Sequence, residues 1–188
     1  MPQTLPGIDS QARSDEELVS ACVAGDRGAF DALVVRHQRE IYRLCYRFVG
    51  NHEDAAELAQ DAFVRAYRAL ANFERTAKFT TWLHRISVNV CLNRLASKRP
   101  RTEALREGHG EASRSERADA SVLREERAAI VRAAIARLPK KQRATVILRA
   151  YHDMPHEEIA AILGGSVSAA KTNFFHALAN LKKLLAPE

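Results

Sequence analysis

The sequence predicts an all-α protein in which two small helical domains are joined by a flexible linker. Apolar residues recur at three- and four-residue steps through most of the chain, and almost nothing alternates with the two-residue period of a strand. A chain of 188 residues with 46% hydrophobic content has enough apolar material for one or two small cores. Between residues 101 and 127 the composition turns to Glu, Arg, Ser, Ala and Gly, which is typical of a linker with an Ala-rich end that can be helical.

Two apolar series predict the first long helices, and the break between them falls at Gly50-Asn51. The first series is Phe30, Leu33, Val34, Ile41, Leu44, Cys45 and Phe48. The second series is Leu58, Ala59, Ala62, Phe63, Ala66 and Leu70.

A third helix is expected from Trp82, and it should end before Pro100 because the residue before a proline is biased away from helix. Residues four apart stack along a helix surface. One face is therefore apolar, with Trp82, Ile86 and Val90, and the neighbouring face is polar, with Arg85, Asn89 and Asn93.

The second half of the chain carries a predicted helix-turn-helix. Leu138-Pro139 divides two helical stretches, and a further apolar helix after Pro155 ends at Gly164-Gly165-Ser166. Ala160 is small where two helices cross, Gly164 permits the sharp turn, and Ser166 can cap the next helix. The alternative is an ordinary helical hairpin in a bundle. The outer face of the last helix favours the helix-turn-helix, with Lys171, Thr172, Phe175, His176, Lys182 and Lys183.

Positive charge gathers in two segments of the chain, whose formal net charge is +6. Residues 71–101 carry seven basic residues against one acidic, and residues 128–188 carry nine against four. Residues 15–70 carry seven against ten, and the stretch 102–127 between the basic segments carries five against seven. A single basic patch is usually a solvated face, but two that bracket a polar spacer favour two contacts on one polyanion, so we expect a nucleic-acid partner.

Other classes of protein are disfavoured. No apolar run approaches the ~20 residues of a membrane span, and the N-terminus lacks a signal-peptide pattern, which predicts a cytoplasmic protein. Cys22, Cys45 and Cys91 form no Cys-x-x-Cys pair and are expected to be reduced core thiols rather than a redox switch. The one candidate metal pair, His152 and His156 beside Glu157, straddles Pro155 and lacks a third ligand. We therefore expect no catalytic residues, no metal and no cofactor.

Residue motifs in both halves resemble a known family. Three stretches of the first half resemble region two of extracytoplasmic-function sigma factors. They are Asp54-Ala-Ala-Glu-Leu-Ala-Gln-Asp-Ala-Phe-Val-Arg-Ala-Tyr-Arg-Ala-Leu70, Asn72-Phe-Glu-Arg75 and Phe79-Thr-Thr-Trp-Leu-His-Arg-Ile-Ser-Val-Asn89. Four short motifs of the second half are similar to region four of the same family: Leu138-Pro139, Glu157-Glu-Ile-Ala160, Leu163-Gly164 and Lys171-Thr172. The resemblance implies a disordered tail at 1–14, a region two domain at 15–101, a linker at 102–127 and a region four domain at 128–188.

The resemblance also implies partners and site residues. The partners would be core RNA polymerase, through the clamp helices of its largest subunit and through its flap, promoter DNA, and an anti-sigma factor. The polymerase contacts would be Asp54, Glu57, Gln60 and Asp61, although these residues also suit a merely solvated face. The minus-ten contacts would be Phe73, Arg85, Asn89 and Asn93, with Trp82 in the core rather than a base platform. The minus-thirty-five contacts would be Arg149, His156, Lys171, Thr172, Phe175 and His176.

Two expectations concern how this chain differs from its family and how it moves. Family members usually carry Arg near His176 and Arg at the position of Asn173, so two fixed positive charges are absent from the usual duplex-contact face. In the free or anti-sigma-bound protein the two domains should be able to pack close together and hide the Asn89 and Lys171 faces from DNA and polymerase. Within the last helix, Phe174 and Leu178 are expected to pack inward while Lys171, Thr172 and His176 stay exposed. A stand-alone helix-turn-helix regulator would explain residues 128–188 but leaves the first domain without a task.

Overall fold

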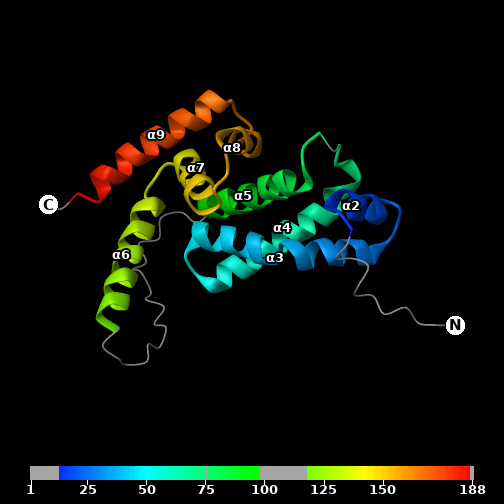
Figure 1. Ribbon diagram of the computed structural model, residues 1–188, viewed down its shortest axis with the longest axis horizontal. Coiled ribbons are helices and arrows are strands. Elements are labelled where there is room, and N and C mark those ends of the chain that lie inside the picture. Colours follow the sequence, from blue (N-terminus) through cyan, green and yellow to red (C-terminus); the bar gives the residue numbers. More distant parts are fainter. Residues whose placement is uncertain (1–12, 75, 98–117, 187–188) are drawn as a thin grey trace.

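A computed structural model describes residues 13–74, 76–97 and 118–186, and for residues 118–125 it describes the backbone alone. These residues form eight α-helices and one short 3-10 helix and contain no strand, so the all-α prediction is confirmed (Figure 1). The helices are α2 Asp15–Val23, α3 Arg27–Val49, α4 His52–Ala69, η1 Leu70–Asn72, α5 Phe79–Ser97, α6 Ala118–Ala136, α7 Lys140–Tyr151, α8 His156–Leu163 and α9 Val167–Leu184.

The first domain is a bundle in which α3 packs against α2, α4 and α5. Its helix ends are set by short local signals. The Ser14 hydroxyl accepts a hydrogen bond from the backbone N–H of Glu17, and the Glu17 carboxylate accepts one from the backbone N–H of Ser14, a complete capping box for α2. Gly50 ends α3 in the left-handed conformation, and Asn51 then caps α4, so the predicted break at Gly50-Asn51 is confirmed.

Helix α5 begins at Phe79, three residues earlier than the sequence pattern indicates, because Phe79 itself is buried in the core. The helix is also buried more widely than the single apolar face that was predicted. Its buried residues are Phe79, Leu83, His84, Ser87, Val88, Val90 and Cys91. The physical reason is that α3 and α4 cover one side while α8 of the second domain covers another. Only a narrow polar strip remains in solvent.

The second domain contains α6 to α9, and its division at Leu138-Pro139 is confirmed. Helix α7 packs against α9, and the Asn180 side-chain amide donates a hydrogen bond of 2.8 Å to the Gln142 side-chain oxygen between them. Helices α8 and α9 meet at the predicted turn. Ala160 is buried there, and the Ser166 hydroxyl accepts a 3.1 Å hydrogen bond from the Ala169 N–H. The helix-turn-helix prediction is therefore confirmed in its geometry.

Gly164 is the residue on which that turn depends. Its backbone is left-handed, with φ 64° and ψ 43°, and an added Cβ would meet no atom within 4 Å. We expect Gly164→Ala to lower the free energy of unfolding by about 1 kcal/mol through backbone strain alone. Gly165→Ala is the matched control, because Gly165 lacks a positive φ and its added Cβ would only touch the Cβ of Ala169 at 4.0 Å. Urea unfolding measures both, and equal losses would contradict this account of the turn.

The two domains pack against each other through α5 on α8 and α3 on α7 (Figure 1). The Arg143 guanidinium donates a hydrogen bond to the carbonyl oxygen of Phe48. The guanidinium carbon of Arg47 lies 4.1 Å from the centre of the Tyr151 ring, at the distance of a cation–π contact.

The expected tail at 1–14 lies outside the described residues except for its end, where Ser14 caps α2. The expected linker at 102–127 is described only from Ala118, where α6 begins.

Candidate nucleic-acid interface

Helix α5 presents its predicted polar residues to solvent. Arg85, Asn89 and Asn93 are all exposed at four-residue spacing, and we refer to them as the α5 polar stripe. The opposite faces of α5 are held by the core, so the stripe sits on a fixed support. Exposed amides on a rigid helix can hydrogen-bond the edge of an unstacked base.

An aromatic cluster supports the loop that precedes α5. The Phe73 ring lies 4.9 Å from the Trp82 ring and 6.2 Å from the Phe79 ring, measured between centroids. Trp82 is partly buried against the core, in agreement with the prediction that it is a packing residue. Beside this cluster is a cavity of about 410 Å³, lined by Glu16, Val19, Phe73, Thr76, Ala77, Lys78 and Phe79. Glu16 and Val19 of α2 complete this cavity, so it depends on α2 folding back against the loop and could not be predicted from the loop's own sequence.

Helix α4 carries the four predicted polymerase contacts. Gln60 is exposed, and Asp61 accepts a hydrogen bond of 2.9 Å from Arg65 one turn later. Asp54 and Glu57 are both engaged by Arg94 of α5, at 3.4 Å for Asp54. Sequence reasoning missed Arg94, because nothing in a pattern along one helix shows which residue of another helix will face it.

Helix α9 presents most of its predicted contact face. Lys171, Thr172 and His176 are exposed, and Phe175 is 71% exposed, which is high for so large an apolar side chain. Phe174 is partly buried against the core, as expected. The prediction that Leu178 packs inward is wrong, because Leu178 is 49% exposed. The inward face of α9 instead contains the buried residues Ala170 and Ala177, with Phe174, Leu181 and Leu184 partly buried against the core.

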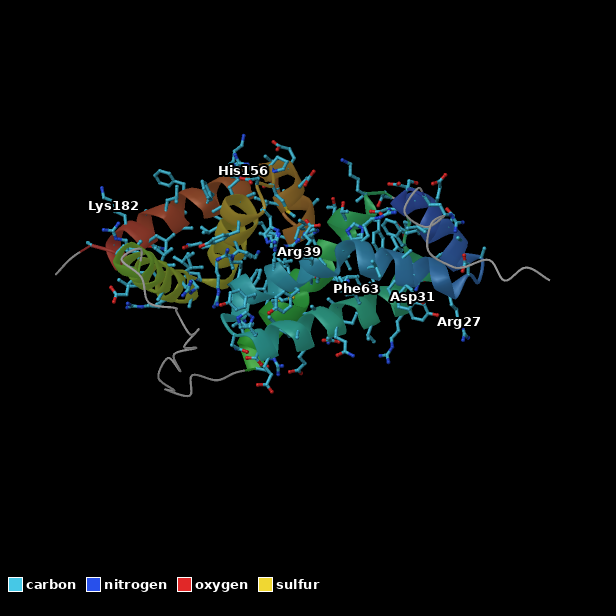
Figure 2. The ribbon with its side chains drawn as sticks, turned by 60° about the horizontal axis from the view of Figure 1, so that its bottom comes forward. Arg27, Asp31, Arg39, Phe63, His156 and Lys182 are labelled. Carbon is cyan, nitrogen blue, oxygen red and sulfur yellow. The ribbon has the colours of Figure 1, made fainter. Side chains whose placement is uncertain are left out.

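Arg149 and His156 do not lie on the exposed face of α9: Arg149 is in α7, and His156 is at the start of α8. The Arg149 guanidinium donates a 3.0 Å hydrogen bond to the carbonyl oxygen of Met154 and so braces the segment between α7 and α8. His156 is the first residue of α8 (Figure 2). Its ring meets that of Phe174 edge-on, with 5.6 Å between the ring centroids. Both side chains are partly buried, so only their solvent-exposed atoms could contact a phosphate.

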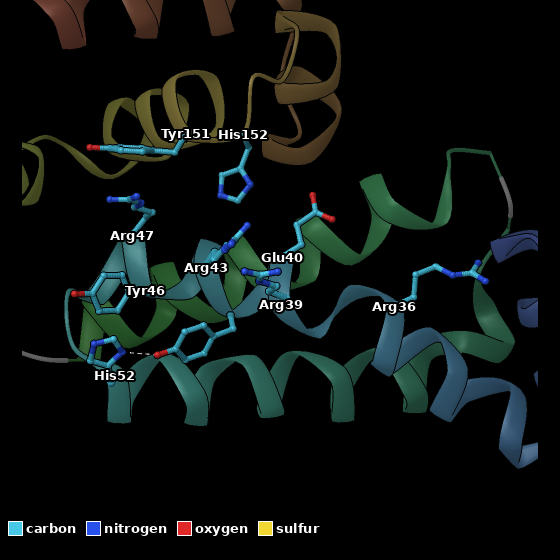
Figure 3. Close-up of a pocket in the computed structure, with 10 residues that line it drawn as sticks. Arg36, Arg39, Glu40, Arg43, Tyr46, Arg47, His52, Tyr151 and His152 are labelled. Atoms are coloured by element: carbon cyan, nitrogen blue, oxygen red, sulfur yellow. Dashed lines mark hydrogen bonds between the residues drawn. The ribbon is translucent and has the colours of Figure 1, made fainter. Parts of the chain in front are cut away.

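The boundary between the domains holds a basic groove that the sequence pattern did not indicate. It is a cavity of about 590 Å³ in which the Arg36, Arg39, Arg43 and Arg47 side chains of α3 follow one another along the helix (Figure 3). The other lining residues are Glu40, Tyr42, Tyr46, His52, Tyr151 and His152. These residues come from both domains, which is why reasoning on each segment alone could not find the groove.

The predicted hiding of the two contact faces is wrong. The domains do pack together, but Asn89, Asn93 and Lys171 all remain exposed. The reason is that α5 meets α8 with its buried residues, while its polar stripe points elsewhere. The closed arrangement therefore leaves both faces exposed to solvent.

The thiols of the three cysteines are free. Cys45 and Cys91 are buried as predicted, and a hydrogen bond with Cys45 raises the pKa of the Cys91 thiol above its usual value. Cys22 is only half-buried, and its burial together with the nearby Asp26 raises its pKa as well. Each of these two shifts disfavours the reactive thiolate.

Among the described helices, none is long and apolar enough to cross a membrane.

Comparison with known proteins agrees with this geometry. The family model of Sigma-70 region 2 matches residues 33–101, and that of Sigma-70 region 4 matches residues 128–181. The RNA polymerase sigma-H factor of Pseudomonas aeruginosa PAO1 is 34% identical over 182 residues, which cover 92% of this chain and 94% of that protein. The ECF RNA polymerase sigma factor SigM of Mycobacterium tuberculosis H37Rv is 38% identical over 174 residues, covering 92% and 85%.

A solved structure of CnrH in complex with the cytosolic domain of CnrY resembles the whole arrangement. It matches with a TM-score of 0.67 at 28% identity and covers 91% of this chain and 96% of that chain. The likeness therefore includes both domains. On these matches, the chain belongs to the extracytoplasmic-function (ECF) group of the sigma-70 family of RNA polymerase sigma factors.

Proposed function

We propose that this protein binds core RNA polymerase and directs initiation at promoters that carry its minus-ten and minus-thirty-five elements. The observation that carries the proposal is the pairing of two separate contact faces, the α5 polar stripe and the exposed face of α9, in one chain of this family. Each face suits a different form of DNA. The protein supplies recognition and no chemistry of its own, and it acts where the polymerase acts, in the cytoplasm.

The first domain would capture a melted strand. An unstacked base can enter the 410 Å³ cavity beside Phe73, where apolar and aromatic walls receive its face. Asn89 and Asn93 can bond the polar edge of a neighbouring base, and Arg85 can meet a phosphate. The acidic face of α4, with Asp54, Glu57, Gln60 and Asp61, would dock on the clamp helices of the polymerase's largest subunit. Arg94 would hold two of those carboxylates in place for docking.

The second domain would read duplex DNA and contact the polymerase flap. The N-terminal part of α9 follows the turn at Gly164, the position from which a recognition helix enters the major groove. Lys171, Thr172, Phe175 and His176 would face base edges there, with Arg149 and His156 toward the phosphates. Lys182 lies near the far end of the same helix (Figure 2).

Lys171→Ala is expected to weaken recognition of the minus-thirty-five duplex by about 1 to 3 kcal/mol and to relax one base position if Lys171 meets guanine. If Lys171 meets phosphate, binding should weaken uniformly and the salt dependence should flatten. Lys183→Ala, at the other end of α9, is the matched control with the same loss of charge. Competition binding by the polymerase complex on mutated promoters measures both effects. No change in affinity or preference would favour the hairpin-in-a-bundle interpretation.

A regulator that sequesters the protein is also part of the proposal. CnrH, which is similar over nearly the entire chain, was solved with the cytosolic domain of a second protein, CnrY, bound to it. By that likeness we propose an anti-sigma partner for this protein. Arg39, Arg43 and Arg47 in the basic groove suit a partner segment that carries acidic side chains, whereas Arg36 is paired with Asp15.

The main competing function is that of a stand-alone helix-turn-helix regulator, and binding to purified core polymerase separates the two. A sigma factor should co-elute with core polymerase in equal proportion on size exclusion, whereas an independent regulator should elute alone. Replacing Asp61 by Lys on the exposed α4 face should weaken that complex by reversing one docking charge. The full chain running separately from core polymerase would contradict the proposed function.

A further inference from the structure

Three potential metal-ligand side chains converge where the two domains meet. Glu40 comes from α3, His84 from α5, and His152 from the residue that ends α7. One ligand atom from each of the three side chains lies within 4.8 Å of the others. In Figure 3, Glu40 extends from α3 toward the second domain, and His152 points from the second domain toward α3. The first two residues belong to the first domain and the third to the second domain.

The tautomer of His84 is fixed by its surroundings. Its Nδ1 lies 2.8 Å from the carbonyl oxygen of Thr80, and since a carbonyl only accepts, Nδ1 must carry a proton and donate it. In the neutral ring Nε2 is then a lone-pair acceptor. That Nε2 is buried and lies 3.2 Å from a carboxylate oxygen of Glu40, which is also an acceptor. Two acceptors at this distance need a cation between them, either a second proton on the ring or a metal ion.

His152 distinguishes these two possibilities. Its Nε2 is buried and has no hydrogen-bond partner, and its ring lies 6.0 Å from that of His84, edge to face. The Nε2 of His152 and the Nε2 of His84 are thus two buried ring nitrogens without a hydrogen-bond partner, on either side of the domain boundary. A proton between Glu40 and His84 would leave the His152 nitrogen unpartnered, whereas a metal ion can use all three ligands.

We propose that Glu40, His84 and His152 bind one divalent transition-metal ion of the zinc class, which clamps the two domains together. Two histidines and one glutamate are a known zinc ligand set that leaves a fourth position for water. The bond from His84 Nδ1 to a backbone carbonyl is the support that metal-bound histidines have. This assignment replaces the expectation of no metal site, which weighed His152 only with His156 and Glu157. His156 instead faces Phe174.

The geometry needs a small adjustment to accept the ion. Ligand atoms about 2.0 to 2.2 Å from a tetrahedral zinc lie about 3.4 Å from one another, which the Glu40–His84 pair already matches. The two remaining separations both involve His152 and must close by up to about 1.4 Å, so the partly buried His152 ring has to shift toward the Glu40–His84 pair. Arg43 and Arg47 line the same groove and oppose the cation, while the charge of Glu40 offsets part of their effect.

Because the ligands come from both domains, the ion binds only the closed arrangement and stabilises it by mass action. The metal site itself does not depend on the proposed function. Its effect on transcription does, since a clamped protein would resist the separation of domains on a promoter.

The test uses the full-length protein, stripped of metal with a chelator and then titrated with zinc chloride. We expect one high-affinity ion per chain by calorimetry and a rise in Tm on adding zinc. His152→Ala and Glu40→Gln should each lower the affinity more than ~100-fold, beyond the loss typical of a support residue, and should abolish the Tm rise. His176→Ala removes an exposed histidine on α9 and should leave zinc binding unchanged.

Two results would overturn the site. One is zinc binding that is absent, or equal in the unmodified protein and in His152→Ala. The other is a doubly protonated His84 ring by nitrogen NMR at saturating zinc, which would assign the Glu40–His84 contact to an ion pair. Since neither measurement includes polymerase, a failure here is separate from a failure of the proposed function.

Discussion

Replacing Asn89 or Asn93 by Ala is expected to slow promoter opening about 5- to 150-fold, the equivalent of 1 to 3 kcal/mol for a lost base contact. Both amides are exposed on α5, whose other faces are buried, so their removal should not disturb the fold. The effect should appear on a fully double-stranded promoter and should shrink on a promoter that is already melted, because the amides act on unpaired bases.

The control for this prediction is Gln38→Ala, which removes an exposed amide from α3. Assembly with core polymerase should be unchanged in all three variants. Permanganate footprinting of the melted region measures opening directly. If the asparagine variants open duplex promoters at the unmodified rate, the α5 polar stripe does not contact the minus-ten element.

The second large effect expected is a separation of the two domains when the protein engages a promoter. In the free protein α8 lies on α5 and α7 on α3. The family places its two promoter elements about two helical turns apart, or ~70 Å at ~35 Å per turn. The residues 98–117 reach ~66 Å when fully extended at ~3.3 Å each. The first ten residues of α6 add ~15 Å as helix, so the span is reachable only with the chain nearly stretched.

Spin labels on Val35→Cys and Lys183→Cys, one in each domain, would report this separation. Cys22→Ser provides the background, because Cys45 and Cys91 are buried and resist labelling. The distance between labels should increase on forming the promoter complex, and zinc should narrow its distribution in the free protein. Labels at Val35 and Arg68, both in the first domain, should show no change. An unchanged distance between the domains would refute the opening mechanism.

Much of the fold was predictable because local signals set the helix ends. Gly50 followed by Asn51, Leu138 followed by Pro139, and the turn at Gly164 each act within a few residues, and each division was confirmed. The same holds for the polar stripe of α5, since four-residue spacing places side chains on one face.

Features that depend on a second helix were not predictable in the same way. Leu178 is apolar at a helical spacing but exposed, because α9 packs through another side, which contains Ala170, Ala177 and Leu181. Arg94 holds Asp54 across two helices, and His152 meets His84 across two domains. The spacing of residues within one helix does not predict which residue of another helix they will contact.

The central claim is that this chain lends promoter recognition to RNA polymerase, and sequencing the transcripts of reconstituted polymerase tests it most directly. Core polymerase with this protein should start at a defined set of promoters sharing minus-ten and minus-thirty-five elements, and core polymerase alone should not. The free protein should leave no sequence-specific footprint on the same promoters at ~150 mM salt, where phosphate contacts alone are weak. Tight footprints by the free protein, or start sites that do not depend on it, would contradict the claim.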